Sequence, residues 1–371
     1  MGKAKTFEPV KFIPNSKDEF SSVLRKRVNA YFKENNISKN GNWKMYVKTF
    51  AILFVYFGCY GVFVSGVYNT LLTNTLLAVI MGIATAGIGM AIMHDANHGS
   101  YSKKQWINKL FGYTINLAAG ASATNWRIQH NVLHHTYTNI EGLDEDIDLG
   151  DMMKFGPSIE EKPKKVHKYQ YLYAWFLYGF LTLNWTFVKD FSQAKRYGKM
   201  GLMKTQQTTV AREFTILIVT KLIYFGYILF VPLLVLDISI WEMLLFFFVL
   251  HFVCGSILSW VFQLAHVVED MEFPEFDNNN VVHDSFYAHQ LKTTANFYVS
   301  RLFSWYMGGL NYQVEHHLFP NISHVHYRNL MPIVKSTAEE YGLPYNCAPS
   351  FFKGMRSHIK WLKRVGNPVL A

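Results

Sequence analysis

Histidines gather at three places in the chain and form its most reactive pattern. Of the 15 histidines, His94 and His98 stand four residues apart in Met-His-Asp-Ala-Asn-His-Gly. A spacing of four places both imidazoles on one face of a helix. The segment Gln-His-Asn-Val-Leu-His-His repeats this spacing with His130 and His134, and His135 follows directly. Imidazoles grouped in this way indicate a metal site.

A third cluster, His316 and His317 in Gln-Val-Glu-His-His, brings the clustered histidines to seven. A single pair has an ordinary structural explanation, but hydrogen bonding within a fold does not require seven imidazoles in three clusters. Neutral imidazole suits zinc, copper, iron and nickel. One zinc ion takes only three or four protein ligands. The number therefore indicates two metal ions, and iron is the better candidate because oxygen chemistry needs open coordination positions.

Four long apolar segments must position these clusters. Half of the 371 residues are hydrophobic, and a helix needs about 20 apolar residues to cross a membrane. We predict membrane-spanning helices at about 50–67, 71–93, 214–236 and 240–265. Short links make them two hairpins. The apolar stretches 110–123 and 171–188 are too short or too aromatic for spans, and the second suits a helix in the membrane interface. If 171–188 did span, the histidine clusters would lie on opposite sides.

The distribution of charge orients the hairpins. Eleven lysines and arginines precede the first span, and the two hairpin tips carry none. Positive flanks face the cytoplasm, so we expect both termini and the segment of about 95–213 there, with the histidines converging in one helical cap. The net charge of +10 does not indicate nucleic-acid binding, because the basic residues flank the spans and form no stripe. Anionic lipid headgroups or a phosphate-bearing substrate fit it better.

In this order, and separated by these spans, the three clusters resemble the histidine boxes of the membrane fatty acid desaturase family, HxxxH, HxxxHH and HxxHH or QxxHH. The likeness extends to Thr138, Asn139, Asp144, Asp146 and Ile147 after the second box, and to Gly-Gly-Leu-Asn-Tyr and Leu-Phe-Pro around the third. It predicts a basic cytoplasmic segment at 1–49, a desaturase domain at 50–340 and a cytoplasmic tail at 341–371. The implied fold is all-α, an integral membrane protein whose four transmembrane helices carry a helical cap with a di-iron site.

The resemblance also implies a ligand set. It requires a further histidine near the cytoplasmic end of the fourth span, where His266 stands; the alternative for His266 is a cation favoured by the helix dipole. The expected iron ligands are His94, His98, His130, His134, His135, His266, His316 and His317. Gln313 stands where the commoner third box has its first histidine, and it could bind metal weakly or hold a water.

Residues around the boxes have two interpretations each. Asp144 and Asp146 lie in an acidic run that is either a solvated loop or a set of acceptors for the second N–H of metal-bound histidines. Trp126 and Arg127 precede the second box and could meet an acyl head group, although Trp126 could equally anchor the chain in the membrane interface. His251 lies mid-span in the fourth helix, where we expect packing or hydrogen bonding. The remaining six are expected at the surface or in packing: His167, His283, His289, His324, His326 and His358.

The function implied by the resemblance is oxygen-dependent insertion of a cis double bond into a fatty acyl chain linked to coenzyme A or lipid. Two iron ions and O2 would take part. Gln313 resembles the third box of front-end desaturases, such as delta-6 or delta-5 enzymes. Because the chain has no His-Pro-Gly-Gly haem motif, we expect electrons from a separate ferredoxin or cytochrome b5. The protein would be multi-pass, with a bacterial inner membrane favoured over the endoplasmic reticulum.

Two alternatives stay open at this stage. A membrane di-iron hydroxylase or ketolase uses similar histidine clusters, although the Gln-Val-Glu-His-His-Leu-Phe-Pro context favours desaturation. A metal transporter also joins histidines to spans, but it holds its ligands near the bilayer midplane. Of the histidines considered, His251 alone is placed in that way.

Overall fold

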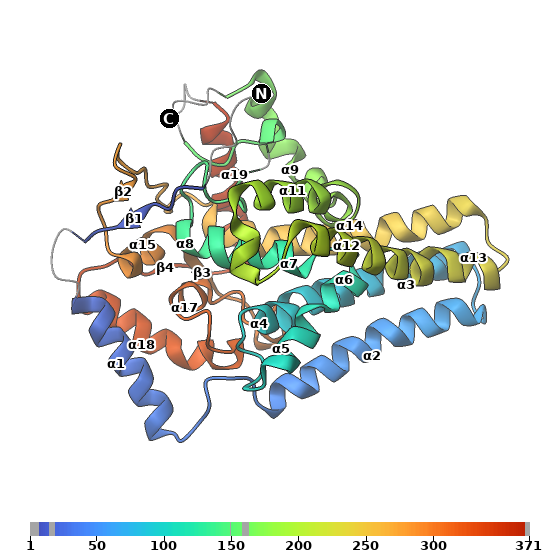
Figure 1. The fold of residues 1–371 in the computed structure, drawn as a ribbon, viewed down its shortest axis with the longest axis horizontal. Coiled ribbons are helices and arrows are strands. Elements are labelled where there is room, and N and C mark those ends of the chain that lie inside the picture. Colours follow the sequence, from blue (N-terminus) through green and yellow to red (C-terminus); the bar gives the residue numbers. More distant parts are fainter. Residues whose placement is uncertain (1–6, 15–18, 149, 158–162, 368–371) are drawn as a thin grey trace. The chain divides into compact units, whose positions relative to one another are not determined.

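The computed structural model describes residues 7–14, 19–148, 150–157 and 163–367. Parts of the predicted N-terminal segment and C-terminal tail, residues 1–6, 15–18 and 368–371, lie outside it. The chain forms two compact units, and Figure 1 labels their helices and strands. The described part of the first unit is Trp43–Ile128 and Trp175–Trp260. The second comprises Phe7–Asn42, Gln129–Ala174 and the chain from Val261 onward.

The first unit is built on long apolar helices. Among the described residues, four are long and apolar enough to cross a membrane, namely Trp43–Ser65, Leu71–Asn97, Val210–Val235 and Ile240–His266. Two of them begin earlier than the apolar runs predict, at residues 43 and 210, because polar residues before each run continue the same helix. The prediction of four membrane-spanning helices in an all-α protein is confirmed.

The spans contain both α-helical and π-helical turns. Their elements are α2 (Trp43–Ser65), α3 (Leu71–Gly87), η1 (Ile88–Met93), α4 (His94–Asn97), α12 (Val210–Phe225), η7 (Gly226–Phe230), α13 (Val231–Val235) and α14 (Ile240–His266). Figure 1 shows α2 and α3 as a hairpin, and α13 leading into α14 as a second. The π-turn η1 ends directly before His94, and such turns occur frequently at functional sites.

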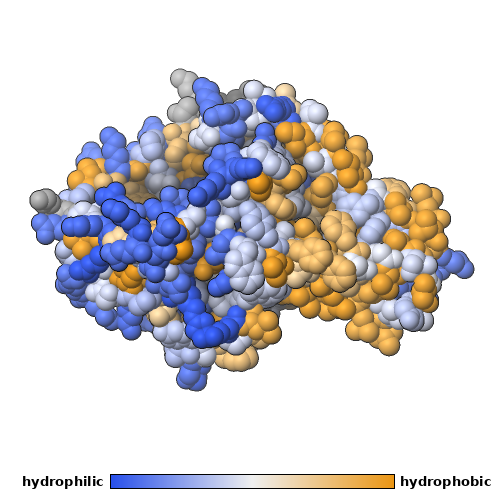
Figure 2. All heavy atoms as spheres, turned by 90° about the horizontal axis from the view of Figure 1, so that it is seen from below, coloured by the Kyte–Doolittle hydropathy of each residue, from blue (hydrophilic) through white to orange (hydrophobic). Residues whose placement is uncertain are grey.

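The outer surface of the spans is apolar. In the most apolar 18-residue stretch of each span, only 28% is buried in the first and third spans, against 72% in the second. Phe50, Leu222 and Leu234 are among the exposed side chains of the outer helices, and Figure 2 shows hydrophobic residues covering the hairpins. So large an apolar surface is unusual on a soluble protein and suits contact with lipid.

Shorter helices complete the first unit. They are α5 (Gln105–Gly112), α6 (Thr114–Ala118), α7 (Ala123–Trp126), α10 (Leu181–Asn184), η5 (Trp185–Lys189), α11 (Asp190–Met200) and η6 (Leu202–Gln206). Helix α9 (Gln170–Tyr178) begins in the second unit and enters the first at Trp175. The stretches 110–123 and 171–188 are divided among these, so neither forms a fifth long helix. A Cβ on Gly255 of α14 would lie 2.7 Å from the Gly179 carbonyl oxygen, so glycine allows the two backbones to approach closely.

Two polar groups within the spans are satisfied internally. The Lys221 ammonium of α12 is buried and donates to the Asp190 carboxylate at 2.8 Å and to the carbonyl of Gly120. His251 of α14 lies 2.7 Å from the Tyr224 hydroxyl and 3.0 Å from the Thr182 hydroxyl. Hydrogen bonding to neighbouring helices, the role predicted for His251, is confirmed.

The second unit is a helical domain with two small additions that the sequence does not predict. Its helices are α1 (Glu19–Glu34), α8 (His135–Tyr137), η3 (Gly150–Met152), η4 (Lys165–Tyr169), α15 (Phe286–Thr293), α16 (Arg301–Tyr306), α17 (Gln313–Leu318), η8 (His324–His326), α18 (Tyr327–Glu340) and α19 (Phe351–Val365). Strand β1 (Lys11–Phe12) pairs in parallel with β2 (Val281–Val282), and β3 (Ala295–Phe297) pairs with β4 (Asn346–Ala348). Leu24 and Val28 of α1 share a core with Leu318, Leu330 and Val334.

The buried Lys221–Asp190 pair generates a stability prediction. Lys221→Met should lower the free energy of unfolding by about 3 kcal/mol, because the Asp190 carboxylate would stay buried without its counter-ion. Lys221→Met/Asp190→Leu should recover most of that loss. Thermal unfolding in detergent, followed by tryptophan fluorescence, measures both. The exposed Lys199→Met is the control, and equal melting temperatures for Lys221→Met and Lys199→Met would contradict the prediction.

Candidate metal centre

Six of the eight predicted iron ligands lie in the second unit, and all six are buried: His130, His134, His135, His266, His316 and His317. His130 and His134 belong to η2 (Arg127–His134), a π-helical segment, and His135 begins α8. A π-helix bonds residue i to i+5, so residues four and five positions apart both approach the same face. The His130 ring accordingly lies 5.1 Å from that of His134 and 4.7 Å from that of His135. The sequence predicts an α-helical pair here, and the wider π-turn adds the third ring.

Three imidazoles from distant parts of the chain form a compact group. His134, His266 and His317 offer ligand nitrogens within 4.8 Å of one another. Among the described residues, none of their Nε2 atoms has a hydrogen-bond partner, although all three are buried. Buried polar atoms without a partner are costly. A bound cation would satisfy all three, so these residues fit a metal ion.

The opposite nitrogen of each ring is held by an acceptor. His134 Nδ1 lies 3.0 Å from the Asp144 carboxylate, and His266 Nδ1 lies 3.1 Å from the Thr293 carbonyl oxygen. His317 Nδ1 lies 2.8 Å from the side-chain oxygen of Gln290. Since these acceptors carry no proton, each Nδ1–H donates and each Nε2 keeps its lone pair. The tautomer is thereby fixed in the form that binds metal.

A second group adjoins the first and shares His317 with it. His135, His316 and His317 also offer nitrogens within 4.8 Å of one another. His135 Nε2 lies 2.9 Å from His316 Nε2 and 3.2 Å from His130 Nε2. Two neutral imidazoles at such a distance need a proton or a cation between their lone pairs. Two neighbouring groups of this kind are suited to two ions.

Burial and the nearby carboxylates shift the pKa values of these histidines in opposite directions. Burial lowers the pKa of His317 well below its ordinary value, and the charges of His266 and His134 lower it further. Burial also opposes charge on His134, but Asp144 and Asp146 outweigh it and raise the pKa of that imidazole. Asp146 is itself held well below its ordinary pKa by His134 and His130, despite its burial. The two carboxylates therefore stabilise positive charge close to His134, while burial keeps His317 in the neutral form that binds metal.

The loop after the second box joins Asp144 to the fourth span. Asn139 adopts a positive φ of 59° and donates its backbone N–H to Asp144 at 2.9 Å. Its side-chain amide donates to the His266 carbonyl oxygen at 2.9 Å. Asparagine tolerates this left-handed conformation better than most residues. Asn139 therefore fixes the acceptor of His134 and the backbone of His266 together.

The third box is supported by residues that the sequence does not single out. Glu315 is buried and accepts hydrogen bonds from the Tyr345 hydroxyl at 2.7 Å and the Asn296 amide at 2.8 Å. Asn296 also accepts the backbone N–H of Val314 at 2.9 Å. Burial raises the pKa of Glu315 to about 7. These contacts orient α17, which carries His316 and His317.

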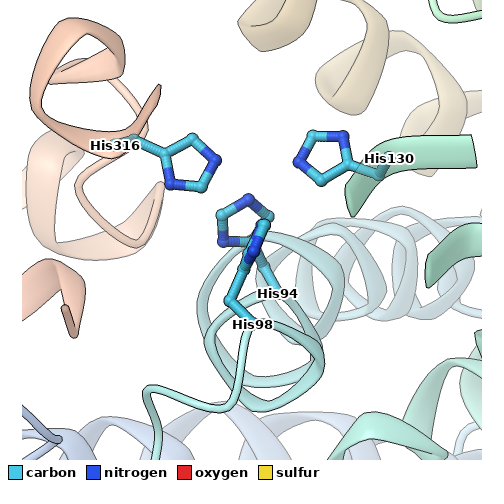
Figure 3. A group of neighbouring side chains, drawn as sticks. All are labelled: His94, His98, His130 and His316. Atoms are coloured by element: carbon cyan, nitrogen blue, oxygen red, sulfur yellow. The ribbon is translucent and has the colours of Figure 1, made fainter. Parts of the chain in front are cut away.

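In the first unit, His94 and His98 end the second span. Figure 3 shows their rings close together on one side of the helix, with ring centroids 4.7 Å apart. In the same figure His130 and His316 of the second unit point toward one another, with ring centroids 5.9 Å apart. The Trp126 ring packs edge-on against His94 and His98, at 5.6 and 5.8 Å between centroids.

Arg127 is tied to the first box as well. Its guanidinium donates to Asn97 at 2.9 Å and to Gln206 at 2.7 Å. Asn97 lies between His94 and His98 in the sequence. These contacts indicate that Trp126 and Arg127 position the first box, and contact with an acyl head group stays a prediction.

Comparison with known proteins identifies the family. Residues 69–349 match the family described as fatty acid desaturase. The chain is 36% identical over 364 residues to an sn-1 linoleoyl-lipid 6-desaturase of Synechocystis sp., covering 98% of this chain and 99% of that protein. It is 35% identical over 353 residues to a protein of the same name from Arthrospira platensis, covering 94% and 93%. An acyl-lipid (8-3)-desaturase of Physcomitrium patens is 36% identical over 355 residues, covering 94% and 72%.

This chain belongs to the fatty acid desaturase family. It is an oxidoreductase that desaturates fatty acyl chains, and its long apolar helices make it a membrane protein. The predicted family and activity are confirmed. Neither a hydroxylase nor a metal transporter is among the named relatives above.

Other predicted residues of the desaturase are placed as follows. Gln313 is buried, and its side-chain nitrogen has no hydrogen-bond partner among the described residues. Its role as a ligand of metal or water stays a prediction. His283 is at the surface beside Asp277. Besides His251, described above, the other five histidines outside the ligand set are buried, as expected of packing residues: His167, His289, His324, His326 and His358.

Several residues of the centre escape sequence reasoning. Gln290, Thr293 and Asn296 lie between the fourth span and the third box, in a segment without any motif. Tyr327, whose hydroxyl lies 3.1 Å from His316 Nδ1, follows the third box by ten residues. The sequence could have indicated them only as polar residues in a segment that must pack against buried histidines.

The Asp144 contact generates a prediction about metal affinity. Asp144→Ala should weaken iron binding by about 10- to 100-fold, because His134 would lose the acceptor that fixes its tautomer. Iron retained after dialysis against graded chelator concentrations measures the change. The matched control is the exposed neighbour Asp148→Ala, which should retain wild-type affinity. Equal iron retention in both variants would refute the proposed support.

Proposed function

We propose that this chain is a front-end acyl-lipid desaturase that inserts a cis double bond at carbon 6 of a linoleoyl group. The observation that carries this proposal is the 35–36% identity, over at least 94% of the chain, to two proteins named sn-1 linoleoyl-lipid 6-desaturase. Gln313 in the third box supports the front-end type. A position nearer the carboxyl end is the second candidate, since a relative named Delta(5) fatty acid desaturase A is 31% identical over 99% of this chain.

We further propose that the eight histidines hold two iron ions. The unpartnered Nε2 atoms of His134, His266 and His317 support this ligand set, and so does the group of His135, His316 and His317. His94, His98 and His130 complete the proposed list. When bound, the iron supplies the activation of O2 that removal of hydrogen from two adjacent methylene groups requires.

The chain's own residues would position and protect this chemistry. Asp144, Thr293 and Gln290 hold the imidazoles in their metal-binding tautomer. Asp146, beside His130 at 3.0 Å, would do the same for that ring. Burial of every histidine in the second-unit group excludes bulk water, which would otherwise compete for open coordination positions.

The membrane and the electron donor complete the proposal. We expect both termini in the cytoplasm, as the charge distribution predicts, and a bacterial inner membrane in preference to the endoplasmic reticulum. A separate ferredoxin or cytochrome b5 would supply electrons.

Expression in a host that lacks polyunsaturated acids tests the activity. Fed with linoleate, cells expressing the chain should accumulate lipids with a new double bond at carbon 6, and gas chromatography with mass spectrometry locates that bond. A double bond at carbon 5 would contradict the proposed position and favour the second candidate. A hydroxylated product, or none, would overturn the proposal as a whole.

Site variants in the same host test the ligand set. His134→Ala and His317→Ala should reduce product below detection, because each removes a nitrogen of the three-imidazole group. The surface histidine variant His283→Ala should make product at the wild-type level. Membrane abundance, followed by immunoblot, must be equal for all three. Product from either of the first two variants at more than about a tenth of wild type would contradict the ligand assignment.

A further inference from the structure

Helix α19 has two chemically distinct faces. Gly354, His358 and Leu362 lie on its buried face, which belongs to the interior of the second unit. The exposed face carries a basic stripe at spacings of three and four residues, Lys353, Arg356, Lys360, Lys363 and Arg364. The helix contains no acidic residue. Phe352, 77% exposed, stands beside the start of the stripe. We call Phe352 and these five basic residues the α19 surface.

The buried face of α19 contacts the segment that carries a proposed iron ligand. His358 donates from Nδ1 to the carbonyl oxygen of Val267, the residue directly after His266. A Cβ on Gly354 would lie 3.6 Å from the Leu264 side chain, two residues before His266. One helix thus separates the basic stripe from the end of α14.

A cavity of about 340 Å³ adjoins the stripe. Leu264, Met271 and Pro349 are among its apolar lining residues. The charged lining consists of Lys353, Arg356, Lys360, Glu269 and Asp270. Basic side chains outnumber acidic ones by three to two in this lining. Charges at a docking surface steer a partner of opposite sign and set the on-rate.

We propose that the α19 surface is the docking site of an acidic one-electron carrier protein. The inference rests on the proposed function, since desaturation needs two electrons from outside. The balance is R–CH2–CH2–R′ + O2 + 2e− + 2H+ → R–CH=CH–R′ + 2H2O. The acyl chain and two carrier molecules are oxidised, and O2 is reduced to water.

The observations favour an acidic protein over an anionic membrane. A helix that lies in a membrane surface places its apolar face in the lipid, but α19 buries that face within its own unit. The charged face of α19 is exposed, so a binding partner would contact that face. Lys360 already pairs with the Glu269 carboxylate at 3.2 Å, so the stripe has the geometry to accept carboxylates.

Carrier binding to the full-length protein tests the proposal. The protein is placed in phosphatidylcholine nanodiscs, and binding of a plant-type ferredoxin and of soluble cytochrome b5 is measured by biolayer interferometry at several salt concentrations. Lys353→Glu/Arg356→Glu should raise the Kd for at least one carrier by about tenfold or more and flatten its salt dependence. The milder Lys353→Gln/Arg356→Gln should give an intermediate shift.

The matched control is Lys26→Glu/Lys33→Glu on the exposed face of α1, which changes the net charge equally. It should leave the Kd within about twofold of wild type. Iron content and thermal stability of all variants should equal those of wild type, because the substituted side chains lie at the surface. Reduction by dithionite should proceed at the wild-type rate, whereas reduction by the carrier should slow in the α19 variants.

Three outcomes overturn the proposal. The wild-type protein binds neither carrier, or the α19 and α1 variants bind them equally. The third is a difference between variants that appears only in nanodiscs containing phosphatidylglycerol, which would assign the surface to lipid. Failure of the proposed function looks different, because wild-type protein would then form no double bond even with dithionite, while carrier binding would still respond to the α19 variants.

Discussion

The fixed tautomer of the buried histidines is the constraint on which the rest of the structure depends. A neutral imidazole binds metal only through a nitrogen that has no proton. In the second unit, acceptors take the Nδ1–H groups of His134, His266 and His317, and this leaves three Nε2 atoms facing one another. The other tautomer of any one of these rings would place an N–H group in this space and would exclude a cation.

The acceptors of these N–H groups belong to segments that are far apart in the chain, and the fold of the second unit brings them to the histidines. Asp144 is fixed by the left-handed turn at Asn139, and Gln290 and Thr293 come from α15. Glu315 and Asn296 then orient α17. Each support is an ordinary hydrogen bond of modest net value, but loss of one leaves a buried group unsatisfied, which costs more than the bond contributes.

Length and periodicity explain what the sequence predicts well. Four apolar runs of about 20 residues specify spans directly, and histidines at fixed spacing specify the boxes. His266 was expected through the family resemblance, and its neighbours His134 and His317 join it in one group. The π-helical turn at His130–His134 was not predictable, because an i to i+5 bond leaves no mark in the pattern of apolar residues.

Other features depend on contacts between residues distant in the sequence. Lys221 reads as an isolated charge in a span, and its partner Asp190 lies 31 residues earlier. Gln290, 27 residues before His317, belongs to no motif. The short ladders β1–β2 and β3–β4 contain two and three residues per strand, which is too few for an alternating pattern to register.

X-ray absorption at the iron edge tests the central claim most directly, because it reports the ligands of the metal itself. The purified protein loaded with iron should show the outer-shell scattering of imidazole rings. His266→Ala should retain less of that scattering, since one anchored ring is gone, whereas His283→Ala should leave the spectrum unchanged. A spectrum with oxygen ligands and no imidazole scattering, or one that His266→Ala leaves unaltered, would contradict the account.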